Sequence, residues 1–211
     1  MSRDIERALT QFFGGRVCLD FGNTLDWRTS EQPQELIPNF EALLGWCERR
    51  HTMPFAALSK LRARAAGKPQ EAEAVMAATV RLREEIWRLS EALRTGGKIS
   101  IERVNALTKA LPSQPRLIAE GADYVFDLPG RELEEVLWPI LWSTTALLTS
   151  HDAARIGMCH GEGCGWFFVD ESPNRSRLWC SSEVCGNRER ARRSYAKRKR
   201  AAGGQACRPQ P

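Results

Sequence analysis

Four cysteines near the C-terminus constrain this 211-residue chain more than any other feature. They form two C-x4-C pairs, Cys159 with Cys164 and Cys180 with Cys185, and 15 residues separate the pairs. Each pair can turn its thiolates inward, and the intervening loop can bring all four sulfurs to one tetrahedral zinc ion. Four cysteine ligands leave no open coordination position for a substrate. The sequence therefore predicts one structural Zn2+.

The remaining sequence context favours a metal over a disulfide. The first residues, MSRDIERALTQFF, are charged and contain no apolar stretch before a small-residue cleavage site, so we expect no signal peptide and a cytoplasmic protein. Thiols stay reduced there, and paired cysteines are then more often metal ligands. A redox switch is the alternative. Cys18 and Cys47 have apolar neighbours and are expected to be buried, inert side chains.

The residues around the cysteines predict a zinc-binding fold. Three glycines surround the first pair, and glycine permits the positive φ values of tight turns. Ser181 or Ser182 can cap a helix whose first turn contains Cys185. Between the pairs, residues 166–169 read as a short strand that enters a turn. A turn, a hairpin and a helix that carries the last ligand make a treble-clef-like arrangement.

Positive charge is concentrated after the metal site. Residues 155–211 contain 12 Lys or Arg against 5 Asp or Glu, whereas residues 1–154 contain 19 against 21. Within residues 187–200, 8 of 14 are basic. Like charges four residues apart on a helix repel, and a phosphate backbone would relieve that repulsion. We therefore expect DNA as the partner, with these contact residues: Arg175, Arg177, Arg188, Arg190, Arg192, Arg193, Lys197, Arg198, Lys199 and Arg200. A solvated, partly disordered basic tail is the alternative.

Residues 159–200 resemble the CGNR zinc finger. The resemblance is carried by Cys159, Cys164-Gly165-Trp166, Asp170, Asn174-Arg175-Ser176-Arg177, Trp179-Cys180-Ser181 and Cys185-Gly186-Asn187-Arg188, with basic residues around Tyr195. Leu178 stands where family members often have another arginine. Residues 17–25, VCLDFGNTL, resemble the opening of the ABATE domain, which commonly precedes this finger in bacterial stress-induced transcription regulators. The resemblance implies zinc ligation by the four cysteines and DNA binding by the finger.

The first 154 residues predict a helix-rich domain. Residues 16–21 read as a strand, and helices are expected at 39–50, 55–66, 71–94 and 100–111. The third helix is the clearest, because its apolar residues recur at steps of three and four, and a Glu84–Arg88 pair is expected on its polar side. Residues 116–119 and 124–128 read as a hairpin around a turn at 120–123.

A last helix of this domain is expected at residues 131–149, apolar on more than one face and kinked or split by Pro139. Trp138 and Trp142 on it are assigned to the core, with a dimer seam as the alternative. The predicted fold class is α+β, predominantly α: a helical N-terminal domain with a small sheet, then a treble-clef-like finger ending in a basic helix. The expected boundaries are 1–154, 155–201 and a disordered tail at 202–211.

The N-terminal region offers one polar constellation that could bind a small effector: Asp20, Asn23, Thr24, Trp27 and Arg28. In this hypothesis the polar residues end a strand beside a cleft, Arg28 meets an anionic group and Trp27 meets a flat one. The alternative is that Asn23 or Thr24 caps the next helix or forms a turn. We find no nucleophile with its base, no phosphate-binding glycine loop and no H-E-x-x-H motif, so no enzyme is expected.

Two further functions remain open at this point. An RNA-binding, ribosome-associated module would use the same charges and stack bases on Trp166, Trp179 or Tyr195. A thiol redox sensor would release zinc on oxidation. A homodimer is plausible because operators often have two-fold symmetry. No apolar run reaches the roughly 18 residues that a membrane span needs.

Overall fold

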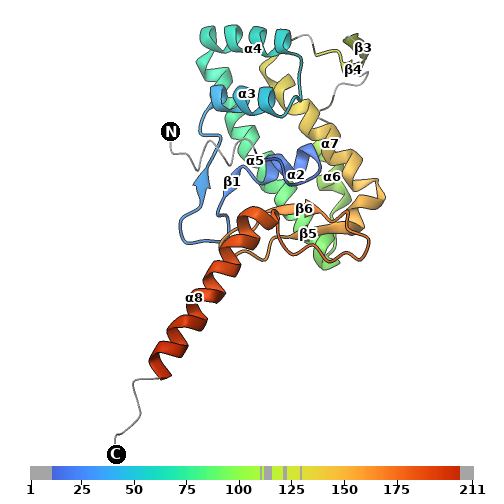
Figure 1. Cartoon of the computed structure of the whole chain (residues 1–211). Coiled ribbons are helices and arrows are strands. Elements are labelled where there is room, and N and C mark those ends of the chain that lie inside the picture. Colours follow the sequence, from blue (N-terminus) through green and yellow to red (C-terminus); the bar gives the residue numbers. More distant parts are fainter. Residues whose placement is uncertain (1–10, 110, 112–115, 121–122, 129, 205–211) are drawn as a thin grey trace, which may run out of the picture.

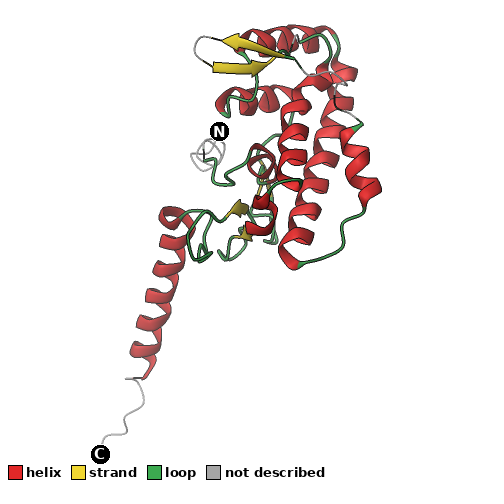
Figure 2. Cartoon of the chain, turned by 90° about the vertical axis from the view of Figure 1, so that its right-hand side faces the viewer, coloured by secondary structure: helices red, strands yellow, loops and turns green. Residues whose placement is uncertain are grey.

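The protein is predominantly helical, with three two-stranded sheets in the part of the chain that the structure describes (Figure 1). The computed structural model describes residues 11–109, 111, 116–120, 123–128 and 130–204. A bundle of helices forms the body, and the last helix projects away from it in both views (Figures 1 and 2). This confirms the predicted α+β class dominated by helices.

Helix α5 (Pro69–Thr95) is the longest element of the body. Proline at its start supplies the fixed φ of a first turn, and Gly96 ends it in the left-handed conformation with φ 69°. Its buried side chains include Val75, Leu82, Ile86 and Leu89, as the predicted apolar stripe requires. The expected Glu84–Arg88 pair is not formed, because Glu84 binds Arg28 instead.

The other predicted helices of the body are also present. They are α3 (Phe40–Arg49), α4 (Phe55–Gly67), α6 (Ile101–Thr108) and α7 (Trp138–Leu148). Asn39 caps α3 by accepting the Ala42 N–H at 2.9 Å, and Ser100 caps α6. The predicted α6 ran to residue 111, three residues too far.

Pro139 splits the last helix of the body as expected. A 3-10 helix, η1 (Leu133–Leu137), precedes it, and the proline falls within the first turn of α7, where its missing N–H costs no hydrogen bond. Trp138 and Trp142 are half-buried and pack against the core. Phe126 stacks on Trp142 with ring centroids 4.0 Å apart, which supports the core assignment of this tryptophan.

The predicted strand at residues 16–21 is wrong. This segment is helix α2 (Val17–Gly22), which contacts both α5 and α7. Five of its six residues are buried. The segment therefore shows neither the two-residue alternation of a half-buried strand nor the 3.6-residue period of an amphipathic helix. A short run that is buried on all sides cannot be assigned from periodicity alone.

The sheets are three antiparallel hairpins. β1 (Leu25–Asp26) pairs with β2 (Gln34–Glu35), and β3 (Leu117–Glu120) pairs with β4 (Asp123–Phe126), the hairpin predicted from sequence. β5 (Ile156–Met158) pairs with β6 (Phe167–Val169). A 3-10 helix, η2 (His151–Arg155), leads from α7 into β5.

The β5–β6 hairpin is part of the main hydrophobic core. Ile156, Phe167 and Val169 belong to the same buried cluster as the side chains of α2, α3 and α5. The Phe167 ring meets Trp87 of α5 edge-on, with centroids 5.5 Å apart. The polypeptide on either side of residue 155 therefore shares one core.

Asn23 completes the free edge of β6. Its amide donates to the Phe167 carbonyl at 2.9 Å and accepts the Phe167 N–H at 2.8 Å. The Val169 N–H donates to the Gly14 carbonyl at 2.9 Å along the same edge. A Cβ on Gly14 would lie 2.8 Å from the Asp20 nitrogen, so only glycine fits this close approach.

We predict that Asn23→Ala lowers the free energy of unfolding by about 2–4 kcal/mol, because it leaves the buried N–H and C=O of Phe167 without partners. Urea denaturation of the zinc-loaded protein measures this change. Asn105→Ala, at an exposed position on α6, is the control and should change stability by less than about 0.5 kcal/mol. Equal stability of the two variants would contradict the role given to Asn23.

Candidate metal centre and basic helix

The four cysteines meet in one buried cluster. Their sulfur atoms all lie within 4.8 Å of one another, and each residue is only 3–4% exposed. Cys159 follows β5, Cys164 ends the first turn, Cys180 follows the loop after β6, and Cys185 lies in η3 (Ser182–Gly186), a single π-helical turn. Two segments of chain thus converge on one point, as the spacing predicts.

The cluster fits a tetrahedral zinc ion. Zinc–thiolate bonds of about 2.3 Å at tetrahedral angles place neighbouring sulfurs about 3.8 Å apart. The sulfurs of Cys164 and Cys180 are 3.8 Å apart, and those of Cys180 and Cys185 are 3.5 Å apart. The Gly161 N–H also donates to the Cys159 sulfur at 3.4 Å. The four cysteines can therefore hold one zinc ion.

The turn and the cap around the cluster follow the sequence prediction. Gly163 and Gly165 adopt φ values of 75° and 69°, which only glycine reaches without strain. The Ser181 hydroxyl accepts the Val184 N–H at 3.2 Å and so caps η3. Because η3 leads directly into helix α8 (Asn187–Gly204), Cys185 lies at the helix N-terminus, where the helix field stabilises a thiolate.

The protonation equilibria of the four thiols favour a bound cation at this cluster. Hydrogen bonds from Cys164 and Cys180 lower the pKa of Cys159 far below its usual range. The pKa of Cys164 is raised by its interactions with Cys159, Cys180 and Cys185 and then by burial. Four adjacent sulfurs cannot all carry charge without a counterion, and a divalent cation supplies that charge.

Cys18 and Cys47 contrast with this cluster. Both are fully buried, and burial raises the pKa of Cys18 to about 11 and that of Cys47 to about 12. They stay protonated at neutral pH and behave as small apolar side chains, as expected from sequence.

Arg177 organises the loop between the cysteine pairs. Its guanidinium donates to the carbonyl oxygens of Phe13 at 2.9 Å, Trp179 at 3.0 Å, Val169 at 3.2 Å and Cys180 at 2.6 Å. It also stacks over the Phe168 ring at 4.1 Å. The nucleic-acid role predicted for Arg177 therefore needs revision, because its guanidinium N–H groups already donate to carbonyl oxygens of the protein. Arg175 is exposed, with φ 50°.

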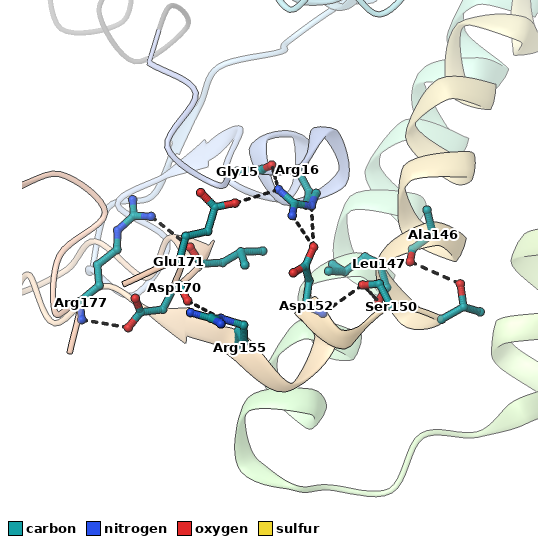
Figure 3. A network of polar contacts seen from close by, with 12 residues as sticks. Gly15, Arg16, Ala146, Leu147, Ser150, Asp152, Arg155, Asp170, Glu171 and Arg177 are labelled. Atoms are coloured by element: carbon teal, nitrogen blue, oxygen red, sulfur yellow. Dashed lines mark hydrogen bonds and ion pairs between the residues drawn. The ribbon is translucent and has the colours of Figure 1, made fainter. Parts of the chain in front are cut away.

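Polar contacts join the loop after β6 to the body (Figure 3). Arg16, before α2, pairs with Asp152 of η2 and with Glu171 at 3.3 Å. Arg155 donates to the Asp170 carbonyl at 2.7 Å, and the Arg177 N–H donates to the Asp170 carboxylate at 2.9 Å. These contacts fix the loop that precedes the second cysteine pair.

The arginines in the first turns of α8 have partners within the protein. Arg188 stacks over the Trp27 ring at 4.1 Å and donates to the Cys185 sulfur at 3.5 Å. Arg192 pairs with Glu162 and Glu189. Glu189 also binds Arg193 at 3.0 Å, and Arg190 donates to the Ser182 carbonyl at 3.0 Å. Glu162 lies in the first cysteine loop, and its pairing with Arg192 was not predicted because the two residues are 30 positions apart in the sequence.

The outer turns of α8 carry unneutralised charge. Lys197, Arg198, Lys199 and Arg200 are exposed, and no acidic side chain lies within 4 Å of them in the described part of the chain. The helix extends to Gly204, beyond the expected end of the finger at residue 201. Of the expected tail, residues 205–211 lie outside the described residues.

Four of the five predicted effector residues are engaged by other groups of the protein. Asp20 is buried and accepts Arg50 Nε at 2.9 Å and the Gly14 N–H at 2.7 Å, and burial raises its pKa. Asn23 holds β6, and Thr24 donates to the Phe21 carbonyl. Arg28 binds Glu84 at 2.6 Å. The premise that Asp20 and Asn23 end a strand is wrong, because the segment is α2.

Comparison with known families agrees with this architecture. Residues 15–151, more than half of the chain, match the ABATE family model, which is described as "Putative stress-induced transcription regulator". The chain belongs to the ABATE family. Residues 155–198, which contain all four cysteines, match the CGNR zinc finger model. No curated protein matches the chain.

The chain thus joins an ABATE region to a CGNR finger, as the motifs indicated. Both families are regulatory or zinc-binding rather than enzymatic types. None of the helices in the described residues is long and apolar enough to cross a membrane.

We predict that Cys164→Ser reduces bound zinc from one ion per chain to well below half, since a serine hydroxyl is a poor substitute for a thiolate. Metal analysis after dialysis against a weak chelator measures the ratio. Cys18→Ala is the control for loss of a buried thiol and should keep one zinc. Full zinc in the Cys164 variant would exclude this cluster as the binding site.

Arg177 and Arg175 provide a matched pair. Arg177→Lys keeps the charge but loses the planar fork that reaches several carbonyls, so the melting temperature of the zinc-loaded ABATE protein should fall by several degrees. Arg175→Lys should leave it unchanged, because Arg175 is exposed. Differential scanning calorimetry distinguishes them, and equal melting temperatures would refute the structural role of Arg177.

Proposed function

We propose that this protein is a zinc-dependent, DNA-binding transcription regulator of the bacterial cytoplasm. The observation that carries the proposal is α8, a basic helix that starts at the metal centre and stands clear of the body (Figures 1 and 2). In this proposal residues 1–154 sense a signal or form a dimer, and residues 155–201 bind nucleic acid. Zinc orders the start of α8 and so sets its direction.

The dimensions and charge of α8 suit duplex DNA. An 18-residue helix is about 27 Å long, and the major groove of B-DNA, about 12 Å wide, admits an α-helix. The outer turns present Lys197, Arg198, Lys199 and Arg200 without acidic partners in the described chain. Basic side chains at these positions can neutralise phosphates and release counterions.

The ten predicted contact residues divide by position. The four on the outer turns are the strongest candidates for phosphate contact, and Arg175 joins them from the loop. In this proposal, the arginines of the first turns can contact DNA only if they leave their present partners within the protein. These are Arg188, Arg190, Arg192 and Arg193. Arg177 is no longer included.

Exposure of the aromatic residues favours DNA over single-stranded RNA. RNA recognition by stacking needs accessible rings. Trp166 is only 6% exposed and Trp179 is half-buried in the cysteine cluster, which leaves Tyr195, 69% exposed, as the one accessible ring of the three proposed. A redox sensor is likewise less favoured, because the four cysteines are buried.

We predict that the triple variant Lys197→Gln, Lys199→Gln and Arg200→Gln weakens binding to duplex DNA. The slope of log K against log salt should fall in magnitude by about 3, since each lost phosphate contact removes roughly 0.9. Fluorescence anisotropy at several salt concentrations measures the slope.

The matched control is Lys60→Gln, Lys98→Gln and Lys109→Gln, which removes the same charge from exposed positions of the body. Its salt slope should equal that of the unaltered protein. Equal slopes for both triple variants would reject α8 as the contact surface. Tighter binding to single-stranded RNA than to duplex DNA would favour the RNA alternative.

A further inference from the structure

The β3–β4 hairpin is a separate two-stranded sheet with exposed apolar side chains. It lies at the end of the molecule opposite to α8 in both views (Figures 1 and 2). Among the described elements, β3 and β4 have extensive contacts only with each other. Leu117 is 60% exposed, Ile118 39% and Tyr124 78%. A lone two-stranded hairpin is marginally stable in water, so this one gains stability if further strands join it.

The outer edge of β3 has backbone groups available for another strand. The Asp127 N–H donates to the Arg116 carbonyl at 2.8 Å, which extends the β3–β4 register by one pair. Backbone groups alternate between the two edges of a strand, so those of Ile118 face β4, while those of Leu117 and Ala119 point outward. In the described part of the chain, no other strand pairs with this edge. Such an edge is a template for pairing with another chain.

The sequence of this edge is complementary to itself in an antiparallel pair. From Arg116 to Glu120 it reads Arg-Leu-Ile-Ala-Glu, with a basic residue at one end and an acidic residue at the other. A two-fold axis at Ile118 places Arg116 of one copy opposite Glu120 of the other on both sides of the axis. It also places Leu117 opposite Ala119, so the outward backbone groups of the two copies meet. Opposite charges and β-branched residues that lie directly opposite each other stabilise paired strands.

The other symmetric registers are less complementary. Outward residues must lie opposite outward residues, which also allows a two-fold axis at Leu117 or at Ala119. An axis at Leu117 places Arg116 opposite Ile118. An axis at Ala119 places Glu120 opposite Ile118. Charge complementarity therefore favours the register centred on Ile118, and it favours a second copy of this chain as the occupant of the edge.

We propose that two copies of this chain dimerise through the outer edges of β3, paired antiparallel about Ile118, so that the two hairpins form one four-stranded sheet. The inference deepens the proposed function by assigning a surface to the dimer, and it rests on that function only for its purpose. A two-fold dimer presents two copies of α8, which matches a pseudo-palindromic operator. The surface differs from the seam at Trp138 and Trp142 considered from sequence.

Sedimentation equilibrium of the zinc-loaded full chain, without DNA, tests the interface. A short strand edge buries less than the roughly 1,200–2,000 Å2 of stable interfaces, so we expect a weak dimer that predominates at about 500 μM and dissociates on dilution to about 5 μM. Each variant is tested in the same way, and its zinc content and melting temperature show whether it is folded.

A pair of proline variants distinguishes the two edges of the hairpin. Ala119→Pro removes an outward N–H and no donor of the β3–β4 ladder, so it should weaken the dimer by at least about tenfold. Tyr124→Pro is the matched control. Tyr124 lies opposite Ala119 in the register, so its N–H points to the outer edge of β4, and its replacement should leave dimerisation unchanged.

A charge exchange tests the register without proline. Glu120→Arg puts two basic residues opposite each other across the interface and should weaken the dimer by at least about fivefold. Within one copy, Glu120 lies opposite Asp123, so the same change places opposite charges in the hairpin and favours its folding. Adding Arg116→Glu restores opposite charges between the copies and should recover most of the lost affinity.

A monomer at every concentration would overturn the proposal. So would a dimer that is equally stable in Ala119→Pro, a dimer that Tyr124→Pro dissociates instead, or a charge exchange that recovers no affinity. If Ala119→Pro does not fold, the charge exchange alone decides. Because no DNA is present, none of these results bears on DNA contact by α8, which the salt slopes test separately.

Discussion

The arrangement of the whole molecule depends on how β6 is held. Alternate residues of a strand direct their backbone groups to opposite edges. The backbone groups of Phe168 are directed at β5, whereas those of Phe167 and Val169 are directed at the body. There the Asn23 amide binds the Phe167 N–H and C=O, and the Gly14 carbonyl accepts the Val169 N–H. A side-chain amide thus replaces a third strand. The finger is thereby joined to the ABATE region through buried hydrogen bonds and a shared core rather than through a linker.

This junction fixes the start of α8. Ser181 caps the turn that carries Cys185, and Arg188 lies over Trp27 of the body. Trp27 has φ 52°, an unfavourable value for a bulky residue. The surrounding contacts must therefore hold its backbone in this conformation. A change in the β1–β2 loop would therefore reach the basic helix through Trp27, without any moving linker between them.

The sequence reveals elements with strong local signals and misses those defined by distant partners. The cysteine spacing, the serine cap and the apolar stripe of α5 each encode their structure within a few residues. Helix α2 has no such signal, because five of its six residues, Asp20 included, are buried. The roles of Asn23 and Arg177 depend on backbone groups 144 and up to 164 residues away, which no local pattern contains. For the same reason, the sequence did not predict that Arg50, Phe167 and Glu84 would be the partners of Asp20, Asn23 and Arg28.

Charge along α8 changes from its root to its end. Glu162 and Glu189 pair with Arg192 and Arg193 in the first turns, where the helix must fold close to the metal centre and like charges would oppose folding. Farther out, four consecutive basic residues repel one another with no compensation among the described residues. Such a segment gains stability when a polyanion lies along it, because phosphates remove the repulsion that the protein leaves in place. The two acidic residues thus lower the net positive charge of the helix near the metal centre, and its outer turns keep theirs.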